Sequence, residues 1–180
     1  MSQETNLYTV TVPPMMKALK ALSGILDKLD THAKGKQLEW HPPGLQEDAL
    51  LQSRLISDQF PFVRQVQVAC DNAKGAAARL AEIEIPKFED NEKTVAELKA
   101  RIEKTLKFLK TIKPEQIIGK ESVKVSLPYW NGKSMNGFDY ITQQVLPNFY
   151  FHVTTAYSIL RKNGVALGKS DYMGELPLKD

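Results

Sequence analysis

Hydrophobic residues recur every three or four positions in four separate stretches of the chain. This spacing places them on one side of an α-helix. We therefore predict amphipathic helices over about residues 13–32, 55–81, 94–112 and 138–160. The apolar positions that define them are Val12, Met15, Leu19, Leu22, Leu26 and Leu29, then Leu55, Phe62, Val66, Ala69, Ala73, Ala76 and Leu80, then Val95, Leu98, Ile102, Leu109 and Ile112, and finally Phe138, Ile141, Val145, Phe149, Ala156 and Leu160.

Local signals mark the ends of these helices. Pro13 and Pro14 suit a helix start, because the first amides of a helix have no partner within it. Thr94 and Glu97 have the spacing of a capping box, in which each side chain accepts a hydrogen bond from the backbone of the other. Residues 161–164, two basic residues followed by Asn-Gly, indicate the end of the last helix.

Other segments depart from helical spacing. Residues 35–44 contain two prolines and then a glycine, which predicts a loop. Residues 123–127 alternate apolar and polar side chains, and Asn131-Gly132 favours a tight turn, so we expect a short hairpin. Pro147 removes an amide donor inside the last helical stretch, which predicts a kink or a new helix start.

Four apolar helix faces are best buried against one another, since one short hairpin cannot cover them. We therefore predict an all-α protein: a four-helix bundle with a small β-hairpin insertion between the third and fourth helices. The length of 180 residues is near that of one average domain, so we take residues 1–180 as a single domain. Residues 165–180 are read as a tail.

Composition narrows the class of protein. Lys and Arg number 24 and Asp and Glu 21, and the resulting net charge of +3 is too small to indicate nucleic-acid binding. No apolar run is long enough to span a membrane, and the N-terminus lacks the pattern of a signal peptide. Cys70 is the single cysteine and cannot form an internal disulfide. We expect a cytoplasmic protein that binds neither nucleic acid nor membrane.

Charged residues on the third predicted helix fit a solvent-exposed face. Glu97 with Arg101, and Glu103 with Lys107, are four positions apart in the favourable order. Each such pair contributes about 0.2–0.5 kcal/mol on an exposed helix surface. The lone Cys70 lies on the second predicted helix with no activating base nearby in sequence, so we expect a buried, inert thiol.

Three polar residues stand on apolar helix faces. His152 shares a face with Val145 and Phe149 in the fourth helix, and Asn148 lies one turn earlier. Asp58 falls on the apolar stripe of the second helix if that helix is continuous from Leu55. A carboxylate, an amide and an imidazole would then converge between two helices, where bundle sites are commonly built.

Each of these residues also has a structural explanation. A lone histidine on an apolar face is usually held by hydrogen bonds. Asp58 would cap the helix if Gln59 were its first residue, and Pro61 would then lose no hydrogen bond. Asn148 would bind backbone groups that are freed by Pro147.

Several segments resemble a known family. The main one reads Pro147-Asn148-Phe149-Tyr150-Phe151-His152-Val153-Thr154-Thr155-Ala156-Tyr157, and residues 159–161, 163–165, 60–67 and 78–80 extend it. Together they resemble an uncharacterised bacterial family of DinB/YfiT-like bundles. The resemblance implies a four-helix bundle of this type, often dimeric, with no established activity for this branch.

Better-known members of the wider superfamily hold a divalent metal with one histidine on the second helix and a His-x-x-x-His pair on the fourth. The resemblance places His152 at the second histidine of that pair, Asn148 at the first, and Asp58 at the ligand on the second helix. Two of the three histidines are therefore replaced, one by an amide, which is a poor ligand for transition metals. The standard metal site is accordingly in question.

Two functional hypotheses follow. The first is a homodimeric bundle without cofactor, whose polar pocket of Asp58, Asn148 and His152, with Tyr150 and Tyr157 nearby, binds a small molecule or serves structure alone. The alternative is a divalent-metal-dependent hydrolase or transferase with a non-standard metal site of Asp58 and His152. A third interpretation is an interaction protein that acts through its dimer surface.

Overall fold

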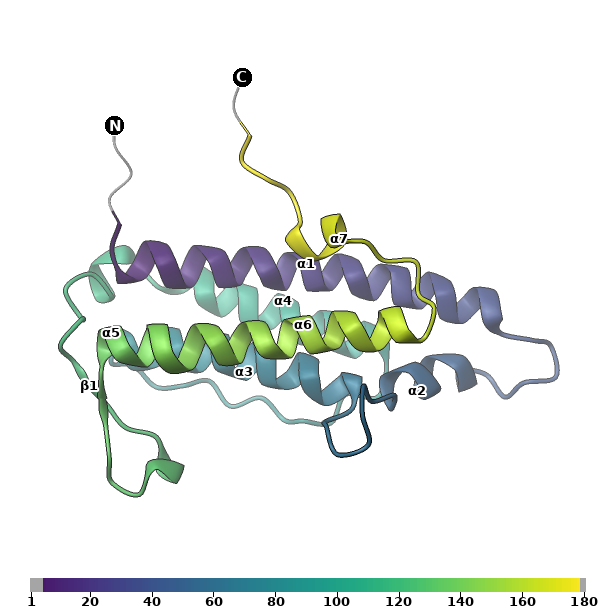
Figure 1. The fold of residues 1–180 in the computed structure, drawn as a ribbon, viewed down its shortest axis with the longest axis horizontal. Coiled ribbons are helices and arrows are strands. Elements are labelled where there is room, and N and C mark those ends of the chain that lie inside the picture. The colour runs from purple at the N-terminus through teal and green to yellow at the C-terminus, as the bar shows by residue number, and fades with distance from the viewer. Residues whose placement is uncertain (1–4, 179–180) are drawn as a thin grey trace.

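The computed structural model describes residues 5–178, which are mostly helical with one small antiparallel sheet (Figure 1). This confirms the predicted combination of helices and a small hairpin. The helices are α1 (Leu7–Lys36), α2 (Leu45–Leu51), α3 (Phe62–Leu80), α4 (Val95–Thr111), α5 (Gly137–Asp139), α6 (Leu146–Lys162) and α7 (Lys169–Met173), and the strands are β1 (Lys124–Val125) and β2 (Met135–Asn136).

The long helices α1, α3, α4 and α6 lie side by side (Figure 1). Helix α3 packs against α4 and α6, and α1 packs against the same two helices. The core between them contains Leu22 of α1, Phe62 of α3, Leu98 of α4 and Phe149 of α6, all shielded from solvent. Across residues 5–178, none of the helices is long and apolar enough to cross a membrane.

Helix α1 begins earlier than predicted. The amide of Thr9 donates to the Asn6 side-chain oxygen over 3.0 Å, and the amide of Asn6 donates to the Thr9 hydroxyl over 3.0 Å. This reciprocal pair starts the helix at Leu7, so Pro13 and Pro14 lie inside it and the predicted start at these prolines is wrong. Asn6 supplies an N-cap upstream, and the residues on both sides of the prolines, Val12 and Met15, are buried, so packing keeps the backbone helical through the two residues that lack donors.

The predicted helix over residues 55–81 is also wrong at its beginning. Helix α2 occupies Leu45–Leu51, an irregular loop follows, and α3 begins only at Phe62. Pro61 has extended backbone angles at the N-cap position, and the amide of Phe62 donates to the carbonyl of Ser53 over 2.9 Å. Leu55, the first residue of the predicted stripe, lies in the loop and is 37% exposed.

Two predicted helix ends are confirmed. Thr94 accepts a hydrogen bond from the Glu97 amide, and the Glu97 carboxylate accepts one from the Thr94 amide. Helix α6 ends at Lys162, and Gly164 follows with a φ of 84°. Glycine reaches this left-handed conformation without the steric penalty that a Cβ atom imposes.

The hairpin is shorter than its alternating sequence predicts. Val125 pairs with Met135, and Lys124 with Asn136. Asn131 and Gly132 both have positive φ values, of 50° and 80°, as their residue types predict. However, a 3₁₀ turn over Pro128–Trp130 precedes them, so the strands are joined by a longer loop and not by a two-residue turn.

A π-helical segment, Tyr140–Val145, runs directly into α6, whose first turn contains Pro147. The amide of Leu146 donates to the carbonyl of Ile141, five residues back. The backbone therefore stays helical from Gly137 to Lys162, and the irregularity expected near Pro147 is a wide π turn that accommodates the residue that cannot donate, not a new helix start.

The tail packs back onto the bundle as far as the end of α7. Val165 and Leu167 are buried, and α7 lies along α1. Lys28 and Asp171 form an ion pair with 2.8 Å between nitrogen and oxygen. The tail therefore covers part of α1 in its own chain.

Candidate functional site

His152 turns its ring into the protein, as its spacing predicts, and is 7% exposed. Its Nδ1 lies 2.7 Å from Oε1 of Gln65 in α3. Because Nε2 of Gln65 donates to the carbonyl of Phe60 over 3.0 Å, Oε1 is the atom that faces the ring. Nδ1 of His152 therefore donates the hydrogen bond.

The surroundings of His152 favour its neutral form. Burial lowers the pKa of the ring, and the cationic side chain of Arg64 lowers it further. The partner from α3 is Gln65, a polar residue that the apolar stripes do not include. A glutamine on the buried side of α3, opposite an inward histidine, was the available signal.

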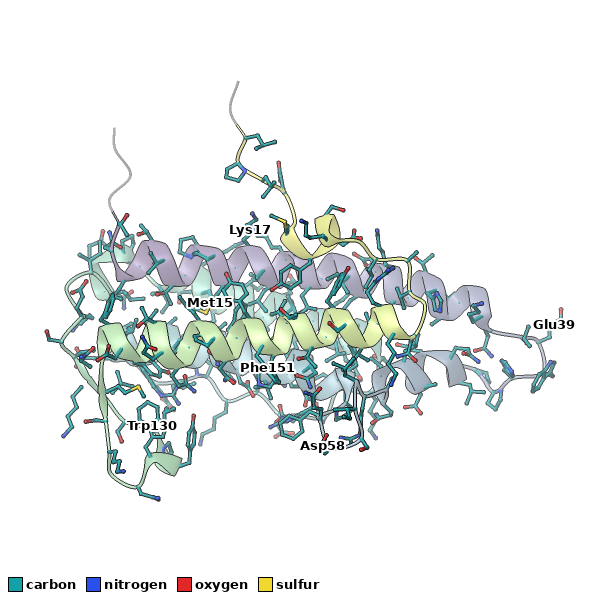
Figure 2. All side chains as sticks on the ribbon, in the orientation of Figure 1. Met15, Lys17, Glu39, Asp58, Trp130 and Phe151 are labelled. Atoms are coloured by element: carbon teal, nitrogen blue, oxygen red, sulfur yellow. The ribbon has the colours of Figure 1, made fainter. Side chains whose placement is uncertain are left out.

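Asp58 does not join this pair. It is exposed and lies in the loop between α2 and α3 (Figure 2). The N-cap of α3 is Pro61, without a side-chain hydrogen bond, so the predicted capping role is wrong, and so is the placement of Asp58 on a buried helical stripe. Both errors have the same cause: the segment between α2 and α3 is not helical, and α3 begins only at Phe62.

Tyr150 and Tyr157 face α1 and α7. Tyr150 lines a groove together with Pro14, Lys17 and Tyr172, and burial raises the pKa of its hydroxyl. The rings of Tyr157 and Tyr172 pack edge to face with their centres 5.8 Å apart. The structure therefore groups these two tyrosines with the tail and not with the ring of His152.

Asn148 lies on a different cleft, which we call the α3–α6 cleft. It is formed by α3, the π-helical segment, the start of α6 and the loop after β1, and it has a volume of about 230 Å³. Its lining residues are Arg64, Val68, Asp71, Asn72, Arg79, Leu127, Tyr129, Tyr140, Gln144 and Asn148.

The α3 side of this cleft follows helical spacing. Arg64, Val68, Asn72 and Arg79 are separated by four, four and seven residues, which puts them on one face of α3. Our sequence prediction followed apolar residues and missed this polar face. The recurrence of polar residues at helical spacing was present in the sequence and would have identified it.

Asp71 links the cleft to a buried group of charges. Its Oδ1 lies 2.8 Å from Nζ of Lys74 and 2.8 Å from a guanidinium nitrogen of Arg101. Arg101 also pairs with Asp90 at 2.8 Å and with Glu92 at 2.9 Å. These contacts hold the loop over residues 82–94 against α3 and α4.

The predicted exposed pair of Glu97 and Arg101 is therefore wrong. Glu97 serves the N-cap of α4, while the Arg101 side chain is only 1% exposed and points toward α3. Its three carboxylate partners attract it inward more strongly than one exposed glutamate would. The pair of Glu103 and Lys107, at 2.8 Å, forms as predicted.

Two groups in the α3–α6 cleft retain hydrogen-bonding capacity. Nη1 of Arg79 donates to the Tyr140 hydroxyl over 3.2 Å, and the salt bridges among residues 5–178 give Arg79 no carboxylate partner. Oδ1 of Asn72 is buried, and no described group donates to it. Nearby, Nε2 of Gln144 donates to the Tyr129 hydroxyl over 3.3 Å.

The side chains described here do not fit a metal centre. Within residues 5–178, no three His, Cys, Asp or Glu side chains are grouped so that they would hold a metal ion. Near His152 the partner is an amide, and Asp58 lies in the exposed loop before α3. Metal-dependent chemistry through Asp58 and His152 therefore stays a prediction. Residues 5–178 do not bring these two side chains together with a third ligand.

The fold matches the crystal structure of a DinB family member protein from Shewanella denitrificans with a TM-score of 0.88 and 42% sequence identity, over 97% of this chain and 95% of that one. The chain is thus a DinB-like helical protein. More specifically, the profile of DUF1993, a domain of unknown function, matches residues 7–173, and the chain belongs to this family. No curated protein matches it. The resemblance seen in the sequence is confirmed.

Proposed function

We propose that this protein binds a small polar molecule in the α3–α6 cleft. The observation that carries the proposal is the buried Oδ1 of Asn72, which has no donor within the described chain. A buried acceptor without a donor costs about 1–3 kcal/mol. Because this oxygen is shielded from solvent, a ligand reaches it only when the Asn72 side chain turns into the cleft, and a donor at that position would then recover the cost.

The residues around Asn72 are arranged for such a ligand. Asn148 from α6 and Asn72 from α3 line the same cleft from opposite sides. Tyr129 and Tyr140 are held by hydrogen bonds to Gln144 and Arg79, so their hydroxyl groups are already oriented. A binding group that is fixed before the ligand arrives loses less conformational entropy on binding.

The volume of the cleft limits the ligand. About 230 Å³ is smaller than the roughly 300–1,000 Å³ typical of sites for drug-sized molecules. The ligand would therefore have few non-hydrogen atoms. A second cleft, of about 610 Å³, shares Asp71 and Arg79 with the first and offers room for a larger substituent.

This proposal keeps part of the pocket predicted from sequence. Asn148 remains a binding residue, whereas His152 would act by joining α6 to α3 through Gln65. Asp58, Tyr150 and Tyr157 take no part. The expected homodimer is a separate proposal, and sedimentation of the purified protein would test it.

A thermal-shift screen with a library of small polar metabolites tests the proposal. We expect at least one compound to raise the melting temperature of the native protein, and Asn72→Leu and Asn148→Leu to lose that increase. Gln143→Leu is the matched control, because Gln143 is exposed next to the cleft residue Gln144. A library without any hit, or hits that persist in both cleft variants, would refute the proposal.

A further inference from the structure

Arg79 is the least satisfied cation in the α3–α6 cleft. Its guanidinium is half-buried, and its hydrogen bond goes to a neutral hydroxyl, that of Tyr140. Arg64, the other arginine of the cleft, is already paired with Asp90 and also donates to Gln67 over 3.2 Å. A guanidinium fork binds carboxylates in a bidentate manner, so Arg79 is the free anchoring group for an anionic ligand.

The position of Arg79 is fixed by two neighbours. A Cβ atom at Gly75 would lie 2.6 Å from Nη1 of Arg79, so the absence of a side chain at residue 75 lets the guanidinium fold back along α3. Burial raises the pKa of the Tyr140 hydroxyl, which therefore stays protonated and neutral beside the cation. Arg79 is held in place without its charge being neutralised.

The acidic residue of the cleft does not repel an anion strongly. Lys74 and Arg101 both lie 2.8 Å from Oδ1 of Asp71, and although Arg101 is shared with two further carboxylates, Arg64 pairs with one of them, so three cations balance three carboxylates in this group. Arg79 then contributes a positive charge that no described carboxylate balances. The electrostatic field in the cleft therefore favours a negative group on the ligand.

Asn72 lines the same cleft as Arg79, and its unpaired, solvent-shielded oxygen comes within reach of the same small molecule when its side chain turns toward the cleft. Arg79 folds back to the level of Gly75, which is three residues after Asn72. Three residues correspond to a rise of about 4.5 Å along a helix. A carboxylate at Arg79 and a donor at Oδ1 of Asn72 would thus be separated by only a few bonds.

We infer that the ligand is a small carboxylic acid with a hydroxyl or amino group next to its carboxylate, bound by Arg79 through the carboxylate and by Asn72 through the donor. This inference rests on the proposed function, since it assigns a chemical class to the ligand of the same cleft. Larger 2-hydroxy or 2-amino acids would extend their substituents toward the second cleft, which is lined by Pro86 and Phe88.

The test uses matched probes with the full chain. Lactate, glycerate and serine carry both groups, propionate lacks the donor, and lactamide and propane-1,2-diol lack the carboxylate. Melting temperatures and calorimetric titrations are measured at constant ionic strength, with sodium chloride and inorganic phosphate as anion controls. We expect the acids with a donor to bind, propionate to bind more weakly, and the two neutral compounds to give no shift.

Variants of the cleft residues test which residue binds which group of the ligand. Arg79→Gln should weaken the binding of the acids by about tenfold or more, because a hydrogen bond to a charged group is lost. Asn72→Leu should remove the preference for lactate over propionate. Arg161→Gln, an exposed change of equal charge on α6, should leave binding unchanged. If Arg79→Gln does not fold, Arg79→Lys keeps the charge without the fork and should still weaken binding.

The outcomes separate this inference from the proposed function. Equal shifts with lactate and lactamide, equal shifts with phosphate, or acid binding that does not change in the Arg79 variants would overturn the carboxylate assignment. If other compounds bind and depend on Asn72 and Asn148, the cleft is still a binding site and only its ligand class is wrong. If neither these probes nor the metabolite library bind, both proposals fail.

Discussion

The ring of His152 and the side-chain amide of Gln65 join α6 to α3 inside the protein, with 2.7 Å between Nδ1 and Oε1. The two helices that carry these residues also form the walls of the α3–α6 cleft. The interpretation of His152 as a core histidine held by a hydrogen bond is thereby confirmed. Its contribution to the cleft is the relative position of the two helices.

Stability should depend on pH through His152. Burial and the charge of Arg64 lower its folded-state pKa below the ordinary 6.5. Between these two pKa values the histidine of the unfolded chain binds a proton more readily than that of the folded chain. The free energy of unfolding should therefore decrease as pH falls from about 6.5 to the folded-state pKa of His152. Denaturant titrations at a series of pH values measure this.

The control for this pH effect is His152→Asn. This variant removes the titrating ring, so its stability should change less than that of the native protein between neutral pH and pH 5. Other groups titrate equally in both proteins, and their effect cancels in the difference. Parallel curves for the two proteins would contradict the prediction.

Arg101→Met should destabilise the protein strongly. The variant leaves Asp71, Asp90 and Glu92 without the buried cation that they share. Breaking a buried ion pair on one side typically costs about 3–5 kcal/mol, and the partial exposure of Asp71 and Asp90 puts this case at about 3 kcal/mol. Chemical denaturation measures it, with Lys107→Met in the exposed pair as a control that should leave stability nearly unchanged. Equal stability of the two variants would refute a stabilising role for Arg101.

The sequence predicted well those features that depend on neighbours along the chain. The capping box of Thr94 and Glu97, the positive φ values of Asn131 and Gly132, and the glycine after α6 follow from local hydrogen bonding and steric limits. The inward position of His152 also followed from spacing alone, because one helix is continuous through it.

The predictions that failed concern residues whose positions depend on contacts between distant segments. Asp58 was placed on a helix because the apolar spacing runs through it, but Pro61 and the Ser53 contact delay the start of α3. Arg101 has helical spacing to Glu97 as well as a distant set of carboxylates, and only the folded chain shows which it takes. Gln65 and the polar face of α3, in contrast, have a helical spacing that the sequence itself shows, and a prediction from apolar positions alone does not include them.

Cys70 should be unreactive in the folded protein. It is buried, and desolvation raises the pKa of its thiol to about 12. The reactive thiolate is therefore almost absent at pH 8. An aromatic disulfide reagent should detect no thiol in the native protein and one per chain after unfolding in guanidinium. Rapid labelling of the native protein would contradict the described burial.

Two glycines should respond to alanine in opposite ways. A Cβ atom at Gly137 would lie 2.0 Å from the carbonyl oxygen of Lys120, and backbone atoms cannot move aside as a flexible side chain can. Gly137→Ala should therefore cost about 1–3 kcal/mol, the usual range for overpacking. Gly24 is exposed inside α1 with nothing within 4 Å of a new Cβ. Gly24→Ala should stabilise the protein by about 0.5–1 kcal/mol, since glycine loses more backbone entropy in a helix.

Thermal and chemical denaturation of both variants check this pair of predictions. Gly137 begins α5, directly before the π-helical segment that carries Tyr140 and Gln144 into the α3–α6 cleft. Because a shift of this start moves both residues, Gly137→Ala should also weaken binding of any cleft ligand. Gly24→Ala lies on α1, outside the cleft lining, and should raise the melting temperature without changing that affinity. A Gly137→Ala protein as stable as the native one would show that the Lys120 carbonyl is free to move. The positions of Tyr140 and Gln144 in the cleft would then not depend on the contact between residue 137 and this carbonyl.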